Sequence, residues 1–270
     1  MTTKNHGLTE EQQNFVMENY QKIAGRELSR MFGIGYNKII CFLRQKGLKR
    51  SSRRGTHSLN DFYFNDESKF TSATWFLIGF LIGDGNIASP NNNHKTPQKL
   101  NMSLHTKDKE ILELLKRELE ATCEIKDRIR HDKRTDKDYY ISEFYCNSIQ
   151  LCSDLAKYGI VPQKTGKEFL PDIPNEFFYD FLAGIFSADG CISKSNNSFR
   201  FDICCPTEQF LIDIQTKLGC GKIRFQQQNI YRLVINQTDL VSIAEKLVKS
   251  KEILSRKKEL LIEFLSTRKV

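Results

Sequence analysis

Two aspartates close two copies of one short apolar motif, and carboxylates in such a setting can bind a metal ion. Asp84 follows the apolar part of FLIGFLIGDGNI (residues 76–87), and Asp189 follows that of FLAGIFSADGCI (residues 181–192). The two acids are 105 residues apart (189 − 84), and a glycine follows each of them. A single Asp-Gly after an apolar run is typical of a strand and a hairpin turn. A repeat that matches position by position requires another explanation.

Small residues inside each copy predict a buried helix. Gly79 and Gly83 are four residues apart, as are Gly184 and Ala188, so each helix has a face that another backbone can approach closely. The remaining positions are apolar on nearly every side, which is typical of a helix with no solvent-exposed face. We expect the glycine after each aspartate to stop its helix in the left-handed conformation.

The two helix-end acids predict a divalent metal site. If the helices pack side by side, Asp84 and Asp189 emerge at the same end, where the helix macrodipole disfavours an anion. Two neighbouring carboxylates cannot both stay ionised without a cost in free energy. A hard cation, which prefers carboxylate and carbonyl oxygen, removes that conflict. We therefore infer Mg²⁺ as a cofactor; a purely structural pair of helix-end acids is the alternative.

The segments LIGFLIGDG (77–85) and LAGIFSADG (182–190) resemble the two signature motifs of the LAGLIDADG homing endonuclease family. Ile82 and Ser187 stand where the family's name shows an earlier acid, but the later, metal-binding acid is present in both copies. The resemblance covers about residues 70–270. It implies an α+β fold in which tandem, pseudo-twofold αββαββα halves form a DNA-binding saddle of two four-stranded sheets.

The resemblance also implies an activity and its residues. The expected enzyme is a monomeric, sequence-specific homing endonuclease that cuts double-stranded DNA, hydrolysing one phosphodiester per strand with Mg²⁺ across the minor groove. Its biological role would be homing of a mobile intron or of a freestanding gene. The carbonyl groups of Gly83 and Ala188 would join the two aspartates as metal ligands. Lys164, after a Gly-Ile-Val-Pro turn, and Lys257, before the last helix, would complete the catalytic residues; an exposed lysine at a helix start is the alternative for Lys257.

Alternating segments in both halves predict sheets with one apolar and one basic face. Ile125 and Ile129 in the first half, and Phe199, Phe201, Ile203, Ile223, Phe225, Tyr231, Leu233 and Ile235 in the second, are expected to point inward. The outward side chains are types that contact phosphates and base edges, although an ordinary solvated face is the alternative. The expected DNA-binding residues of the sheets are Lys99, Asn101, Lys126, Arg128, Arg130, Ser193, Arg200, Lys222, Arg224, Gln226 and Arg232.

The first fifty residues predict a separate all-α, helix-turn-helix-like DNA-binding domain. Thr9 is a helix N-cap candidate, and residues 26–40 have the spacing of two helices that join at Gly33, with Leu28, Met31 and Phe32 facing the core. The recognition helix would project Tyr36, Asn37, Lys38 and Arg44. A basic linker (51–69) would lead to the first half (70–170) and the second half (171–270).

Composition agrees with a nucleic-acid partner without proving one. The chain has 270 residues, a net charge of +8 and a pI near 9.0. Its start, MTTKNHGLTEEQQ, has no apolar core of a secretory signal, and its eight cysteines show no disulfide or zinc framework. We expect an intracellular protein, in the cytoplasm or in an organelle if the host is eukaryotic, that is not secreted and has no membrane partner.

Two other functions fit the same scaffold. An RNA-splicing maturase would bind a structured intron RNA and would not need the acids for splicing. A non-catalytic DNA-binding regulator would keep the basic sheets but not require the acids, both of which are present.

Overall fold

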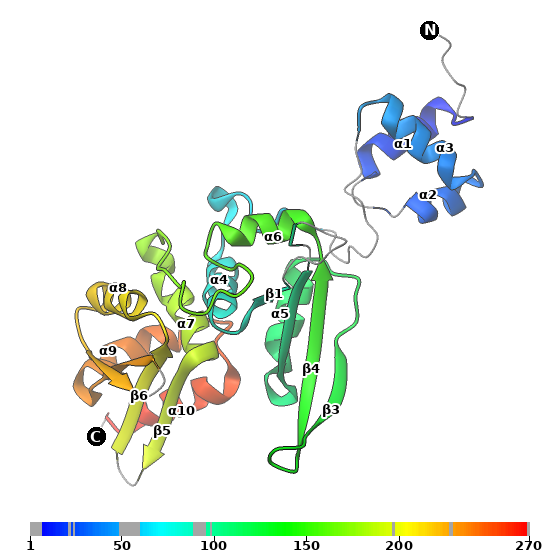
Figure 1. Cartoon of the computed structure of the whole chain (residues 1–270). Helices are drawn as coiled ribbons and strands as arrows, with labels where there is room; N and C mark the ends of the chain where they lie inside the picture. The colour runs from blue at the N-terminus through cyan, green and yellow to red at the C-terminus, as the bar shows by residue number, and fades with distance from the viewer. Residues whose placement is uncertain are drawn as a thin grey trace.

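Two buried helices, α4 (Ser72–Asp84) and α7 (Phe178–Asp189), pack side by side between the two halves of the protein (Figure 1). They belong to a computed structural model that describes residues 7–20, 23, 25–48, 60–88, 96–97, 99–195, 198–226 and 229–268. Both helices end on the predicted aspartates. The prediction of a buried, paired helix for each motif is therefore confirmed.

The helix axes approach closely because glycine occupies the contact. A Cβ atom placed on Gly79 would overlap the carbonyl oxygen of Phe181 and lie 3.1 Å from the nitrogen of Ile185. A Cβ atom on Gly184 would lie 2.7 Å from the nitrogen of Phe80. No side chain larger than hydrogen fits either position without a backbone shift.

The glycines that follow the two acids are extended, so the predicted left-handed stop was wrong. Gly85 has φ −68° and ψ 141°, and Gly190 has φ −82° and ψ 151°. The chain runs straight from each helix into the first strand of its half. Glycine is required there for space, because a Cβ atom would lie 2.5 Å from the carbonyl oxygen of Leu81 or of Phe186, respectively.

Each half repeats one order of elements, as predicted. After α4, the first half contains β1 (Asn86–Ile87), β2 (Lys99–His105), η2 (Thr106–Asp108), α5 (Lys109–Glu118), β3 (Lys126–Asp132), β4 (Lys137–Asn147) and α6 (Ile149–Ala156). After η3 (Asn175–Phe177) and α7, the second half contains β5 (Gly190–Ser195), β6 (Ser198–Cys205), α8 (Glu208–Leu218), β7 (Lys222–Gln226), β8 (Ile230–Ile235), α9 (Gln237–Leu247) and α10 (Ser255–Ser266). The antiparallel sheets have the orders β1-β2-β4-β3 and β5-β6-β8-β7.

The inward face of each sheet packs on the helices, except near its outer strand. Phe201 is fully buried and stacks on Phe186 of α7, with ring centroids 4.5 Å apart. By contrast, Ile129 of β3 is 62% exposed and Phe225 of β7 is 64% exposed, although strand register places both on the predicted inward face. Both lie on outer strands, where the described helices do not cover the apolar face.

The N-terminal unit is a three-helix cluster with its own core. It contains α1 (Glu10–Asn19), α2 (Gly25–Phe32) and α3 (Tyr36–Gln45), and its buried residues are Leu8, Val16, Leu28, Ile39, Phe42 and Leu43. Thr9 caps α1 in a capping box with Gln12, and Gly33 turns the chain at φ +62°. Met31, predicted to face the core, is 55% exposed because it lies on the outer side of α2.

The structure describes residues 60–69 of the predicted linker (51–69). Residues 49–59 are not described, but residues 60–69, including η1 (Glu67–Lys69), pack on the first half. Phe64 is fully buried in the main core, and the nitrogen of Asn60 donates to the carbonyl of Leu119 at 3.2 Å.

None of the helices in the described part of the chain has the length and apolar character that a membrane span requires.

Candidate active site and nucleic-acid interface

The paired helices bring the two predicted acids together. Asp84 and Asp189 both reach solvent at the same end of the helix pair. The Asp189 carboxylate lies against the opposite helix, since a Cβ atom on Gly83 would be 2.6 Å from its Oδ2 and 2.5 Å from the Cβ of Ala188. The four residues predicted to bind metal therefore meet at one place.

The electrostatics of the pair favour a bound cation. Partial desolvation, together with the negative charge of Asp84, raises the pKa of Asp189 to about 6. Desolvation also raises the pKa of Asp84, against the opposing charges of Lys257 and Lys164. Each carboxylate is thus destabilised in its ionised form, as expected for two acids crowded at helix C-termini.

Lys164 and Lys257 bind the carbonyl ends of the two central helices. Nζ of Lys164 donates to the carbonyls of Ile82 (2.6 Å) and Gly83 (2.5 Å) at the end of α4. Burial lowers the pKa of Lys164, while the charge of Asp189 opposes that shift. The ammonium group of Lys164 therefore lies where the helix dipole favours a cation and where the last carbonyls of α4 lack helical partners.

Lys257 is the more enclosed of the two lysines. Its Nζ donates to the carbonyls of Phe186 (2.7 Å), Ser187 (2.8 Å) and Gly190 (2.7 Å) around the end of α7. Its side chain is 4% exposed, so the alternative of an exposed lysine at a helix start was wrong. Burial lowers the pKa of Lys257 to about 8.

The donor set fits a hard divalent cation with one competing contact. Two carboxylates and helix-end carbonyls offer only oxygen ligands, which Mg²⁺ prefers. Among the described residues, no group of three or more His, Cys, Asp and Glu side chains could hold a metal. The carbonyl of Gly83, a predicted ligand, already accepts from Lys164, so a cation there would have to share or displace that hydrogen bond.

Ile82 and Ser187, which stand where the family motif has its earlier acid, pack into the core of the two halves. Ile82 and Ser187 are buried, and the Oγ of Ser187 accepts from the nitrogen of Leu254 at 3.2 Å. A carboxylate at either position would enter the core away from the Asp84–Asp189 end. This explains in physical terms why the motif can differ there and keep its exposed acids.

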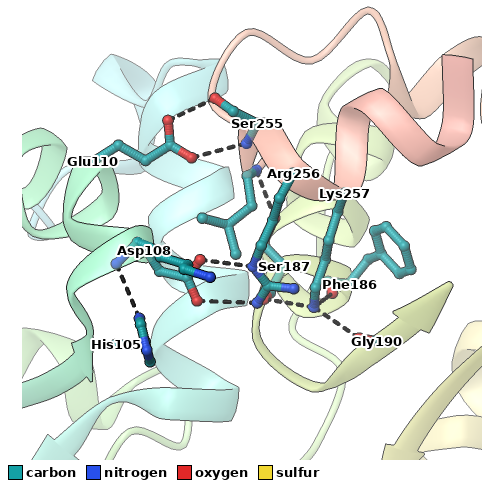
Figure 2. Close-up of polar contacts among 11 residues, drawn as sticks. His105, Asp108, Glu110, Phe186, Ser187, Gly190, Ser255, Arg256 and Lys257 are labelled. Atoms are coloured by element: carbon teal, nitrogen blue, oxygen red, sulfur yellow. Dashed lines mark hydrogen bonds and ion pairs between the residues drawn. The ribbon is translucent and has the colours of Figure 1, made fainter. Parts of the chain in front are cut away.

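A polar clamp, defined as Asp108 and Glu110 with Ser255 and Arg256, joins the halves beside Lys257 (Figure 2). The nitrogen and Oγ of Ser255 donate to Glu110 at 2.8 and 2.7 Å. The Nε and Nη2 of Arg256 donate to Asp108 at 2.7 and 3.0 Å. The clamp fixes the start of α10, and hence the lysine one residue later.

A similar cross-half contact follows Lys164. Glu168 accepts from the nitrogen of Gly166 at 2.9 Å and from the Oγ1 of Thr207, which precedes α8 of the other half. Sequence analysis missed both contacts, because their partners are far apart in the chain and each residue alone is an ordinary surface type.

The predicted DNA-binding residues share the solvent face of each sheet. Strand register places them opposite the helix-covered face: Lys99, Asn101, Lys126, Arg128 and Arg130 in the first half, and Ser193, Arg200, Lys222, Arg224, Gln226 and Arg232 in the second. Tyr36, Asn37, Lys38 and Arg44 are exposed on α3.

Each solvent face also carries an acid that binds one of the predicted arginines. Glu143 binds the Nε of Arg128 at 3.1 Å, and Asp202 binds the Nε of Arg200 at 2.7 Å. The sequence pattern placed Asp202 on the outward face with Arg200, since residues two apart in a strand share a face, but neither ion pair was predicted.

Comparisons with known proteins agree with this geometry. Residues 72–170 match the model of a LAGLIDADG-like domain, and residues 178–252 match that of the WhiA LAGLIDADG-like domain. The fold is similar to the homing endonuclease I-WcaI bound to its DNA recognition sequence (TM-score 0.54, 16% identity, 81% of this chain and 96% of that chain). It is also similar to the meganuclease I-SmaMI bound to uncleaveable DNA (TM-score 0.51, 17% identity, 71% and 88%).

One curated relative shares sequence with part of the chain. A DNA polymerase of Thermococcus hydrothermalis is 30% identical over 119 residues, which are 44% of this chain and 7% of the polymerase. The chain therefore spans only a small part of that relative.

Proposed function

Since the chain carries two LAGLIDADG-like domains in tandem, the second of the WhiA type, we propose that it is a sequence-specific endonuclease that cuts double-stranded DNA with Mg²⁺. The observation that carries the proposal is the meeting of Asp84 and Asp189 at the end of one tight helix pair between two basic sheets. The solved relatives similar in fold are, by description, homing endonucleases or meganucleases bound to DNA.

The residues of the chain divide the task. The solvent faces of the two sheets would bind the duplex, and Asp84 and Asp189 would hold Mg²⁺. When bound, the ion supplies a more acidic water and stabilises charge on the leaving oxygen. Lys164 and Lys257 fix the carbonyl ends of α4 and α7 and add positive charge where the phosphate would lie. Because both halves lie in one chain, the proposed enzyme acts as a monomer.

A second candidate is a DNA-binding protein that does not cut. The hydrogen bond from Lys164 to the Gly83 carbonyl favours it, because an ammonium group there occupies one expected metal ligand. Both candidates bind DNA through the same faces.

Cleavage of a randomised duplex library with and without Mg²⁺ tests the proposal. The variants are Asp84→Asn and Asp189→Asn, and the matched control is Asp172→Asn, an exposed acid between the halves. We expect Mg²⁺-dependent double-strand cutting by the wild type and the control, and its loss in the two site variants with binding retained. Double-strand cutting by both site variants contradicts the metal roles. Wild-type binding without cutting favours the second candidate, and no DNA binding contradicts both.

A further inference from the structure

One acid is buried in the middle of the solvent face of the second sheet. Asp202 of β6 is 2% exposed, although it lies on the face that carries the basic side chains. Burying an ionised carboxylate is costly unless charged or hydrogen-bonding groups compensate it. The compensating groups are Arg200 and Arg232, together with the thiol of Cys204, whose Sγ donates to Oδ1 at 3.8 Å. Asp202 thus contacts two arginines that are predicted to bind DNA.

Arg200 is held so that part of its guanidinium stays available. Its Nε donates to Oδ2 of Asp202 at 2.7 Å, and its side chain is 55% exposed. Within the described part of the chain, that is the one hydrogen bond of its guanidinium. The two Nη groups are the donors that can form a bidentate pair with O6 and N7 of guanine.

Arg232 is held differently. Its Nη1 lies 3.5 Å from Oδ2 of Asp202, and its Nη2 donates to Oε1 of Gln226 at 2.9 Å. Its side chain is 20% exposed, and its Nε is buried without a partner among the described residues. Gln226 therefore holds Arg232 beside Asp202, and Arg200 is the arginine of the pair that reaches outward.

The first sheet lacks a buried acid at this position, although its half-buried Glu143 binds the Nε of the exposed Arg128. Asn86 pairs with Asn101 in the first half as Cys191 pairs with Asp202 in the second, so a neutral amide occupies the position of Asp202. In the same way, Glu143 opposite Lys126 occupies the position of Arg232 opposite Arg224. An asparagine of nearly equal size thus fits this place in the fold.

We propose that Asp202 is a positioning residue for base recognition, which holds Arg200 in the orientation that reads a guanine in the half-site under the second sheet. Arg232 lies beside the carboxylate and is itself held by Gln226. The inference rests on the DNA recognition of the proposed function, with or without cutting.

Selection of bound duplexes from a randomised library tests the inference in the full chain. The variants are Asp202→Asn, Arg200→Lys and their combination, and the matched control is Glu143→Gln, which removes one negative charge from the other sheet. We expect Asp202→Asn and Arg200→Lys each to lose preference for guanine at one shared base pair by about tenfold. The combination loses no more than Arg200→Lys alone, and Glu143→Gln keeps that preference.

The outcomes separate the inference from the function on which it rests. A wild type without base preference contradicts both. A wild type with base preference that Asp202→Asn leaves unchanged contradicts the positioning role alone, as does equal loss in Glu143→Gln at the same base pair. Melting temperatures confirm folding, and the exposed Arg200→Lys variant keeps the test valid if Asp202→Asn is unstable.

Discussion

Charge at the ends of α4 and α7 is balanced at the level of single residues. Each helix ends on an aspartate that its dipole disfavours and is bound by a lysine that its dipole favours. Each lysine donates hydrogen bonds to carbonyl groups at the end of its helix, while the aspartate of that helix reaches solvent. The two residue types therefore have separate tasks in one small volume.

Lys257→Met should destabilise the fold. Methionine keeps much of the length of the side chain but removes the Lys257 donor from three carbonyls around the end of α7, of which that of Phe186 still accepts from the nitrogen of Gly190. A buried polar group without a partner costs about 1–3 kcal/mol, so we expect a loss near the upper end of that range in urea unfolding. Lys251→Met, at an exposed lysine of the preceding loop, is the control. Equal stability of the two variants would contradict the assigned role.

Cysteine alkylation should report both burial and DNA binding. Cys191 is exposed on the solvent face of β5, whereas burial raises the pKa of Cys152 and of Cys205 to about 12. A raised pKa keeps a thiol protonated, so alkylation at pH 9 should modify the exposed Cys191 and leave the two buried thiols unreacted. Mass spectrometry measures each site. Bound duplex DNA should protect Cys191, and unchanged labelling in the complex would argue against binding by this face.

At the scale of elements, the close approach of α4 and α7 is the feature that other contacts depend on. Gly184→Ala places a methyl group against the backbone of α4, 2.7 Å from the nitrogen of Phe80, where no side chain can move aside. We expect a loss of about 3 kcal/mol in the free energy of unfolding and reduced cutting, because the helix ends and their acids separate. Chemical denaturation and cleavage assays check the two effects.

The control adds the same methyl group in open space. Gly35 has φ −59°, and an added Cβ would have no other atom within 4 Å. Gly35→Ala should leave unfolding of the two halves unchanged. If Gly184→Ala behaves like this control, the helices are not in the tight contact described.

Elements were predictable from the sequence where local pattern and tertiary structure agree. The repeated motif predicted two buried helices and the residues that meet at their ends, because small residues four apart need a close partner. Ile129 and Phe225 lie on the predicted inward face but are exposed, because alternation gives the face of a strand and not the extent to which other elements cover it. The clamp around Asp108 and Arg256 depends on a contact between distant segments, which no local pattern encodes.

At the scale of the whole molecule, the two sheets share a plan but differ in charge placement. The central position of the solvent face carries Asn101 in one sheet and Asp202 in the other, and the neighbouring position carries Glu143 and Arg232. Under the proposed function, two faces with different donors and acceptors would not read the same base sequence equally well. The duplicated chain therefore combines a symmetric helix pair with two solvent faces that differ in charge.

Two truncated chains should show that the N-terminal unit and residues 60–69 have different effects, the first on DNA binding and the second on stability. A chain that begins at Asn60 loses α1–α3 but keeps Phe64 in the main core, so we expect unchanged stability of the two halves, weaker DNA binding and a shallower salt dependence. A chain that begins at Thr71 also loses Phe64, which is fully buried, and should unfold with at least roughly 3 kcal/mol less free energy. Urea unfolding and binding titrations at several salt concentrations measure both. Unchanged affinity of the Asn60 chain at moderate salt would contradict a DNA-binding role for the helices, and equal stability of the two truncated chains would contradict the packing of residues 60–69.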